Sequence, residues 1–490
     1  MMKIRLTWKS ALLTAVTVLL IVMGLKTWLV SSRFHSSSEQ KLKLEMDSAA
    51  AHRLQQAVGI ASISYDDSSL KDFRNIDSLI GFLKFNYPQT FRQLHCDTIN
   101  THSLLLHWKG SGDVTAQKPV LLYAHMDVVP ADTGSENGWR FESFTKELTD
   151  DTIRGRGTVD DKLGVIGILE ATERLIRKGF TPKRDIYFAF GHDEETGGTE
   201  GAAAITSTLK NRGIMAEWML DEGGMVAEGL VPFVDQPVAL VMTAEKGYIT
   251  IDLTTEGHGG HSSFPPKESP IDILAAAIVR LNEKPLEATI SEPVAMFMDQ
   301  VGPAMRFPFN VVFANRWIFA PLVISEYEKI PEGNATIRTT LAWTMSQSGI
   351  KDNVLPSKAT VTANLRILPG NTIESTLKEI TGIIHDDRIT IRVHPGAMEP
   401  IAASSTASEG YRQIQQAIHS TFPDAIVAPN LSIASTDSRH FASVAQQRFR
   451  FLPVRMDKDI LSGMHGKNER VAVSAFMESI LFYENLLGAQ

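Results

Sequence analysis

The stretch Ile186–Gly198, IYFAFGHDEETGG, changes character halfway along its length. Its first six residues are aromatic, aliphatic or glycine, as in a buried strand. Two adjacent glutamates, Glu194 and Glu195, follow where this strand would emerge. Neighbouring carboxylates repel each other, so such a pair usually lies on a solvated surface, unless a nearby cation offsets the repulsion. The surrounding sequence decides between these two interpretations.

Similar patterns lie on both sides of this stretch. KPVLLYAHMDVVP (118–130) and EWMLDEGG (217–224) also read as strands that end at loops, and Leu163–Gly179 has helical apolar spacing with a basic last turn. Alternating strands and helices predict an α/β fold with a mostly parallel sheet covered on both faces. Ligands of such sheets bind beyond the carboxyl ends of the strands. We therefore expect four polar residues to gather at one edge: His125, Glu194, Glu195 and Asp221.

The pattern changes between residues 247 and 394. Two stretches there alternate like strands with one solvated face, and they bracket an amphipathic helical pattern at SPIDILAAAIVRLNEK. This predicts a smaller α+β insert. The α/β pattern then returns, so residues 45–246 and 395–490 would form one domain interrupted by the insert. A chain of 490 residues is long enough for more than one core.

The N-terminus, residues 1–35, is apolar and basic. Lys3, Arg5 and Lys9 precede Ser10–Val30, which is interrupted only by Lys26 and is just long enough to cross a bilayer. We expect an uncleaved signal anchor; the alternatives are a cleaved signal peptide, giving a secreted or periplasmic protein, and a buried helix. The basic flank should stay cytoplasmic, which places the rest of the chain outside the cytoplasm. Residues 31–41 are polar and serine-rich, as in a tether.

Composition limits the possible chemistry. The net charge of −8 and the lack of a Lys/Arg-rich block argue against a nucleic-acid partner. Cys96 is the only cysteine, which excludes an intramolecular disulfide and a thiolate metal cage. Any metal would therefore bind to His, Asp and Glu, a donor set that suits catalytic Zn²⁺, with Mn²⁺ or Co²⁺ as alternatives.

Acids and histidines recur where predicted strands end. Each has an ordinary explanation: the histidine of HMD (125–127) as a loop residue, the aspartates of GRGTVDDK (155–162) as helix caps, and the paired glutamates as surface groups. Their number supports a joint role instead. Because one of two adjacent glutamates can bind a cation while the other stays free as a base, the pair has a possible function. The candidates are His125, Asp127, Asp160, Asp161, Glu194, Glu195, Asp221 and His465.

Taken together, these motifs resemble the M20 family of metallopeptidases, and most closely its carboxypeptidase S and N-acyl-amino-acid hydrolase branch. The resemblance covers about residues 50–485 and implies a zinc-exopeptidase-type domain whose insert acts as a lid or dimerisation domain. Members of this branch are commonly secreted or membrane-anchored. The matching stretches, in the order of the family, are LLYAHMDVVP, GRGTVDDK, FGHDEETGG, MLDEGG, GHGGHSSFPPKE, DNVLPSKATVTANLRILPG and GMHGKNERV.

The resemblance implies two zinc ions per chain and a cis peptide between Asp160 and Asp161. Glu194 would be the general base that takes a proton from the attacking water. The implied zinc ligands are His125 and Asp221 on the first zinc, Glu195 and His465 on the second, and Asp160 on both. The remaining implied roles are Asp127 orienting His125, His261 binding the oxyanion, Arg366 and Asn353 holding the substrate carboxylate, and Asp437 and Arg439 lining the pocket.

We therefore expect a hydrolase that acts on a small peptide or an N-acyl amino acid. A carboxypeptidase and a fatty-acyl aminoacylase would share every catalytic residue, and the apolar stretch Val294–Phe313 could line an acyl pocket or form insert core. A non-catalytic membrane receptor with a peptidase fold is the alternative from another class. The chain could be a monomer or a homodimer paired through the insert.

Overall fold

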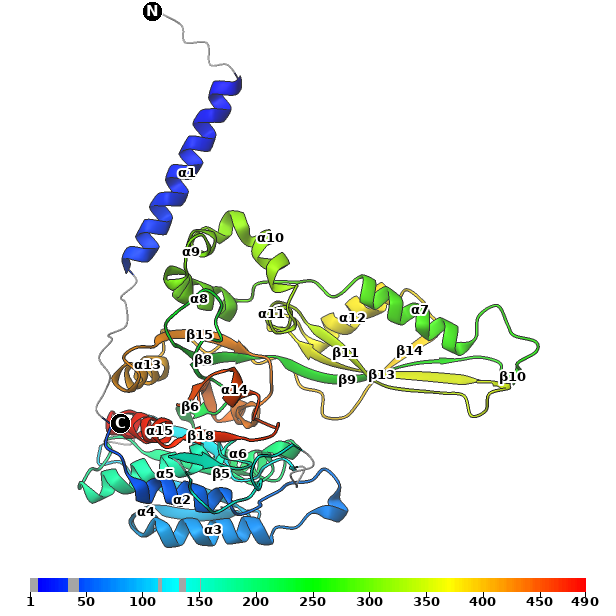
Figure 1. Ribbon diagram of the computed structural model, residues 1–490. Helices are drawn as coiled ribbons and strands as arrows, with labels where there is room; N and C mark the ends of the chain where they lie inside the picture. The colour runs from blue at the N-terminus through cyan, green and yellow to red at the C-terminus, as the bar shows by residue number, and fades with distance from the viewer. Residues whose placement is uncertain (1–7, 34–43, 113–116, 132–137, 150) are drawn as a thin grey trace, which may run out of the picture.

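The computed structural model describes residues 8–33, 44–112, 117–131, 138–149 and 151–490. The expected cytoplasmic residues Lys3 and Arg5 and most of the expected tether lie outside the described residues. Figure 1 shows three parts: a long N-terminal helix, a body that contains the chain's C-terminus, and an arm that extends from the body to one side.

The body is built on a ten-stranded sheet. Its four central strands, in the order β5-β3-β6-β16, are parallel, while antiparallel strands flank them. Strands β3 and β5 are buried throughout, which explains their continuous apolar sequences. The mostly parallel α/β sheet is thus confirmed, with antiparallel flanks. In spatial order the strands are β1 (His95–Ile99), β2 (Ser103–Trp108), β5 (Ile186–Gly191), β3 (Val120–His125), β6 (Ala216–Asp221), β16 (Ala445–Arg450), β8 (Val238–Glu245), β7 (Met225–Ala227) and β17 (Arg455–Met456), with β15 (Ile426–Ser432) also paired to β8.

Helices cover both faces of this sheet. One face carries the largest core, to which α5 (Lys162–Arg177) and α15 (Val473–Gly488) contribute, and the other carries a smaller core with α6 (Ala202–Asn211). Asp161 is the N-cap residue that precedes helix α5, and its side chain accepts a hydrogen bond from the Gly164 N–H. The other body helices are α2 (Ser48–Val58), α3 (Arg74–Asn86), α4 (Pro88–Gln93), α13 (Glu409–Thr421) and α14 (Lys458–Leu461). Short pieces complete the body: η1 (Ser68–Leu70), η3 (Glu194–Thr196), η5 (Asp437–Ser443) and the paired strands β4 (Thr152–Arg154) and β18 (Arg470–Ala472).

The arm is a separate α+β unit with its own core. Its antiparallel sheet has the order β11-β13-β9-β14, and α7 and α12 pack against it. Strand β9 alternates between buried and partly buried residues, as its sequence predicts. The elements are β9 (Gly247–Glu256), α7 (Pro270–Glu283), β11 (Thr340–Ser348), β13 (Lys358–Ile367), α12 (Ile373–Ile384) and β14 (Ile389–Val393), with β10 (Gly260–His261) and β12 (Val354–Leu355) paired near the tip.

A helical segment within the predicted insert packs on the body instead of the arm. Val294, Phe297 and Met298 of α8 share a core with Val238 of β8 and Leu431 of β15. The stretch Val294–Phe313 therefore supplies apolar residues that cover body strands. Residues 247–394 do not form one compact insert, because this segment returns to the sheet edge. Its elements are α8 (Glu292–Val301), η4 (Gly302–Ala304), α9 (Phe309–Ala314), α10 (Arg316–Tyr327) and α11 (Pro331–Ile337).

The N-terminal helix α1 (Trp8–Arg33) is long and apolar enough to cross a membrane by length and composition, and its apolar residues are exposed. Its C-terminal part lies beside α9. The Asn315 side-chain amide donates to the Met23 carbonyl at 3.3 Å and to the Thr27 hydroxyl at 3.1 Å. These contacts fix where the helix meets the body.

Candidate metal centre and active site

The carboxyl ends of the parallel strands bring the predicted polar residues together. His125 is the last residue of β3, η3 with Glu194 and Glu195 follows β5, and Asp221 ends β6. Asp160 comes from the turn before α5, where Gly155 and Gly157 adopt positive φ angles of 133° and 86°. The peptide between Asp160 and Asp161 is cis, as the resemblance implies.

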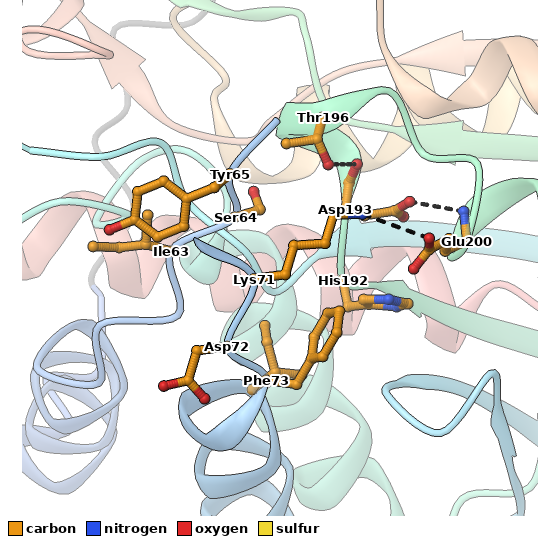
Figure 2. A pocket seen from close by; sticks show the side chains of 11 residues that line it. Ile63, Ser64, Tyr65, Lys71, Asp72, Phe73, His192, Asp193, Thr196 and Glu200 are labelled. Atoms are coloured by element: carbon orange, nitrogen blue, oxygen red, sulfur yellow. Dashed lines mark hydrogen bonds and ion pairs between the residues drawn. The ribbon is translucent and has the colours of Figure 1, made fainter. Parts of the chain in front are cut away.

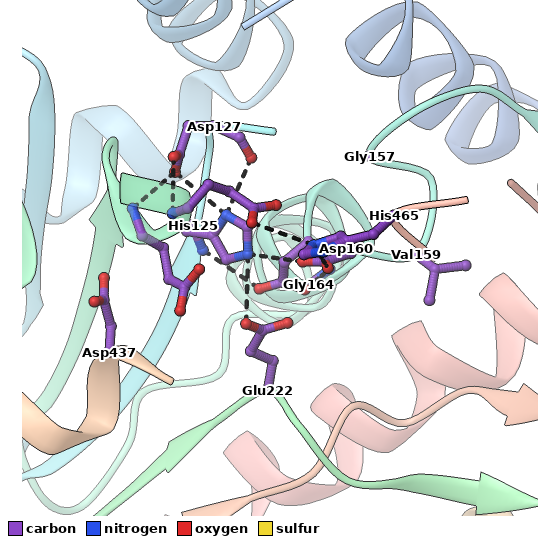
Figure 3. A network of polar contacts seen from close by, with 12 residues as sticks. His125, Asp127, Gly157, Val159, Asp160, Gly164, Glu222, Asp437 and His465 are labelled. Carbon is purple, nitrogen blue, oxygen red and sulfur yellow. Dashed lines mark hydrogen bonds and ion pairs between the residues drawn. The ribbon is translucent and has the colours of Figure 1, made fainter. Parts of the chain in front are cut away.

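Two groups of potential ligands share one carboxylate (Figure 3). In the first, His125 Nε2 lies 2.9 Å from Asp160 Oδ1 and 3.4 Å from Glu222 Oε1. In the second, His465 Nε2 lies 3.0 Å from Asp160 Oδ2 and 3.2 Å from Glu195 Oε2. Because Asp160 uses a different oxygen in each group, it could bridge two adjacent cations.

Glu222, which the sequence analysis missed, occupies the position expected for Asp221. The Asp221 carboxylate accepts bonds from the backbone N–H groups of Glu222, at 2.9 Å, and Ser438, at 2.7 Å. Its oxygens therefore hold the chain that leaves β6, and they do not belong to either ligand group. The signal was present in the sequence, because the adjacent acids of LDEGG repeat the arrangement of Glu194 and Glu195.

The residues present fit a pair of dications. Burial, followed by the nearby Asp160 charge, raises the pKa of Glu222 to about 8. Burial also raises the pKa of Glu195, whose Oε1 is buried and has no hydrogen-bond partner among the described residues. The hydrogen bonds that His465 donates to the Asp160 and Glu195 carboxylates raise its pKa to about 10. This excess of buried negative charge, with two imidazoles and no thiolate, is a donor set suited to Zn²⁺ or a similar cation.

Asp127 connects both parts of the site. Its Oδ1 lies 3.3 Å from His125 Nδ1, and its carboxylate accepts the backbone N–H groups of Glu194 and Glu195, each at 3.2 Å. The Ser64 hydroxyl donates to its Oδ2 at 2.6 Å. Asp127 is thus positioned to orient the histidine ring and the glutamate turn at once.

Glu194 lies beside the ligand groups without belonging to either. Burial raises the pKa of its carboxyl well above the usual range, and the charge of Asp437 adds to the effect. Asp437 itself is fully buried and accepts a hydrogen bond from the Tyr123 hydroxyl. The Asp437 carboxylate, which we had expected to line the substrate pocket, therefore faces the interior next to Glu194.

A second missed residue, Glu469, holds the loop that carries Asp160. One carboxylate oxygen accepts the N–H groups of Val159 at 2.8 Å and Asp160 at 3.3 Å. The other accepts the Gly157 N–H at 3.1 Å and pairs with the buried Arg156 guanidinium at 2.7 Å. Glu469 follows His465 closely in GMHGKNER, so this segment supplies both a potential ligand and the support for another.

The residues expected to bind the substrate lie in two separate regions, one near the base of the arm's sheet and one near the arm's tip. Arg366, on β13, is half-buried; its guanidinium donates to the Ser435 hydroxyl at 3.0 Å and lies 4.8 Å from the ring centroid of Tyr248. Burial, and then the charge of nearby Arg439, lowers the pKa of Arg366. His261, on β10, and Asn353, just before β12, are exposed near the arm's tip, and Figure 1 shows that end extending away from the body.

A small pocket is lined by Ser64, His192, Asp193 and Thr196, among others (Figure 2). Its volume of about 10 Å³ would hold a water molecule and no substrate. Asp193 at its wall accepts the N–H groups of Glu200 at 2.7 Å and Gly201 at 2.8 Å. The pocket therefore belongs to the framework that supports the Glu194–Glu195 turn.

Residues 121–489 match the family described as Peptidase family M20/M25/M40. The chain belongs to this family. M20 proteins are metal-dependent hydrolases for which zinc is the usual metal, so this chain is a zinc-dependent hydrolase.

Two relatives align over most of this M20 chain. Probable carboxypeptidase S-like 2 of Dictyostelium discoideum is 37% identical over 445 residues, covering 90% of this chain and 85% of the relative. N-fatty-acyl-amino acid synthase/hydrolase PM20D1 of Xenopus tropicalis is 34% identical over 495 residues, covering 98% of this chain and 94% of the relative. The M20 metallo-carboxypeptidase Sso-CP2 of Sulfolobus solfataricus shares the fold, with a TM-score of 0.64 at 19% identity. The match covers 90% of this chain and 99% of that protein.

Proposed function

We propose that this M20 protein is a two-zinc amidohydrolase that releases an amino acid with a free carboxylate from a peptide or an N-acyl conjugate. The observation that carries the proposal is the pair of ligand groups joined by Asp160, with Glu194 beside them. The first zinc would bind to His125 and Glu222, with Glu222 replacing the Asp221 of our initial expectation. The second would bind to Glu195 and His465, and Asp160 would bind to both.

Glu194 is the residue that moves protons. Zinc ions held by these residues would lower the pKa of a water molecule and would polarise the amide carbonyl. The Glu194 carboxylate accepts the proton that water loses as its oxygen bonds to the carbonyl carbon. It then delivers that proton to the nitrogen of the amide, so the C–N bond breaks and a neutral amine leaves. Burial raises the pKa of the Glu194 carboxyl, which makes it a stronger base than an exposed carboxylate, and Asp127 holds the Glu194 backbone in place by accepting its N–H.

Arg366 and Arg439 are the proposed partners of the substrate carboxylate. Both are cations close to one another, and Arg366 is partly shielded from water by Tyr248. A guanidinium can bind a carboxylate through two parallel hydrogen bonds, which makes it suited to selecting a free carboxyl end. His261 and Asn353 lie on the arm, so any part they take in binding requires movement of the arm or a second copy of the chain.

The names of the relatives suggest two acyl groups. One is a probable carboxypeptidase S-like protein and the other an N-fatty-acyl-amino acid synthase/hydrolase. The proposed site treats both substrates alike, because the amide, the leaving nitrogen and the free carboxylate are common to them. Comparing a Gly-Leu dipeptide with a long-chain N-acyl leucine, at equal enzyme concentration, identifies the preferred class.

Substitution Glu194→Gln tests the proposal against a non-catalytic receptor. Removing a general base should lower kcat by about 10²- to 10⁴-fold, while two zinc ions remain bound. Glu200→Gln is the matched control, because Glu200 is an exposed acid a few residues away that contacts neither ligand group. Equal turnover of the two variants would contradict the assigned role, and absence of both zinc and turnover in the wild-type protein would contradict the whole proposal.

We also propose that α1 anchors the protein, with the body on the non-cytoplasmic side. The length and apolar exposed surface of α1 support an anchor, and Lys9 adds a positive charge at its N-terminal end. Cleavage after α1 would instead release a soluble enzyme. Membrane fractionation of the full chain, followed by N-terminal sequencing, distinguishes the two.

A further inference from the structure

The surface next to α1 is unusually apolar. Residues 317–324 of α10 read WIFAPLVI and include no charged or hydrogen-bonding side chain except the indole of Trp317. Val323 is the buried residue of this helix and Ile324 packs against the same core, while Trp317 and Leu322 remain exposed. A helix that is apolar on all sides is typical of a nonpolar environment and not of a water-exposed surface.

Large side chains on this surface are accessible. The exposed fractions are 81% for Phe307, 55% for Trp317 and 49% for both Leu322 and Ile330. We call these four residues the α9–α10 surface. They come from a segment whose other face is already occupied by β8 and β15, so the body itself offers them no further cover. Several large exposed apolar side chains within one short segment favour a contact with a partner or a membrane.

The position of α1 identifies the partner. Asn315, between α9 and α10, bonds to Met23 and Thr27, and Lys26 and Val30 line a small cavity together with Trp317. Figure 1 shows the N-terminal half of α1 extending past α9 and α10. From Trp8 to Val30 the helix is about 34 Å long, close to the roughly 30 Å of a bilayer core. Met23 and Thr27 would then lie in the outer part of that core.

Because Asn315 bonds to these residues, the junction between α9 and α10 lies beside the part of α1 that would occupy the outer part of the bilayer core. We propose that the α9–α10 surface is embedded in the non-cytoplasmic leaflet of the bilayer that α1 crosses, and that it forms a second membrane contact. Trp317 and the neighbouring Arg316 suit the boundary between lipid tails and headgroups, where aromatic and basic residues are common. The inference rests on the proposed anchoring by α1 and does not depend on which substrate the enzyme hydrolyses.

Site-directed spin labelling of the full chain in phosphatidylcholine vesicles tests this contact. In a Cys96→Ser background, single labels would be placed at Leu322→Cys and Phe307→Cys on the proposed contact. Leu20→Cys on α1 is the lipid reference, and Ile350→Cys, at a position 96% exposed on the arm, is the aqueous reference. All four positions are exposed, so labelling should not disturb a core. The measurement compares collisions of each label with oxygen, which concentrates in lipid, and with a water-soluble nickel chelate.

We expect labels at 322 and 307 to resemble the label at 20, with oxygen collisions exceeding nickel collisions, and the label at 350 to show the reverse. If the labels at positions 322 and 307 collide mainly with nickel, as the label at 350 does, while the label at 20 still collides mainly with oxygen, the inference is overturned and the anchor stands. Low collision rates with both reagents, together with coupling between labels, would overturn it in favour of a second copy of the chain. An aqueous label at 20 would overturn both the anchor and the contact. Hydrolysis is measured separately, so failure of the proposed activity would leave these results unchanged.

Discussion

Replacing Glu222 should weaken zinc binding and at the same time stabilise the metal-free protein. Loss of a group that only supports a metal ligand costs about 10- to 100-fold in affinity. A direct ligand should cost more, so we expect Glu222→Gln to lower the affinity of one of two zinc ions by over about 100-fold. That corresponds to roughly 3 kcal/mol, at 1.4 kcal/mol for each factor of ten.

The opposite effect on the metal-free fold follows from the raised pKa. Glu222 has an ordinary pKa of 4.5, which the folded protein raises to about 8. At pH 7 the unfolded chain ionises this carboxyl while the folded chain keeps it protonated, so the group destabilises the fold increasingly as the pH rises from 4.5 to 8, and by its full amount above pH 8. The 2.5-unit gap up to pH 7 amounts to about 3 kcal/mol as an upper bound. The substitution Glu222→Gln should therefore raise the free energy of unfolding of the metal-free protein by part of that amount.

The assay is a zinc titration against a competing chelator, paired with urea unfolding of the chelated protein. Asp221→Asn is the matched control, because Asp221 is the adjacent acid whose oxygens accept backbone N–H groups. It should still bind two zinc ions, and its loss of affinity should stay within the roughly 10- to 100-fold expected for a supporting group, below the loss in Glu222→Gln. If Asp221→Asn loses a zinc while Glu222→Gln keeps both, the assignment of Glu222 is refuted.

Three further predictions concern buried residues: Glu469, Lys246 and Met298. Glu469→Gln removes one partner of a buried ion pair with Arg156, so it should destabilise the protein by about 3–5 kcal/mol in urea unfolding and weaken zinc binding; normal zinc affinity would contradict the supporting role. Burial lowers the pKa of Lys246 to about 7 from 10.5, so folding stability should rise from pH 7 to 10, and Lys246→Met should flatten that rise. Met298→Ala should cost about 2–5 kcal/mol, because Met298 is fully buried between α8 and the sheet edge; a cost below 1 kcal/mol would argue against this packing.

Much of the fold could be predicted because its signals are local. Strands such as Ile186–Gly191 are buried on both faces and so carry continuous apolar sequences, and β9 alternates because one face is solvated. The sequence did not predict that residues 247–394 would divide between the arm and the body. Residues 292–337 have apolar helical patterns that would suit either the arm or the body, and only the unfilled edge at β8 and β15 decides where they pack.

The site shows the same division. The sequence by itself determined the chemistry: acids and histidines at the ends of parallel strands, no thiolate, and a spare glutamate at position 194. Only the tertiary structure decided which acid does what. Asp221 and Glu222 are adjacent acids. Asp221 accepts the N–H groups of Glu222 and Ser438, which leaves the Glu222 carboxylate as the potential metal ligand. Hydrogen bonds between segments more than 200 residues apart leave no periodic trace in the sequence, so they are fixed only when the folded chain brings their donors and acceptors together.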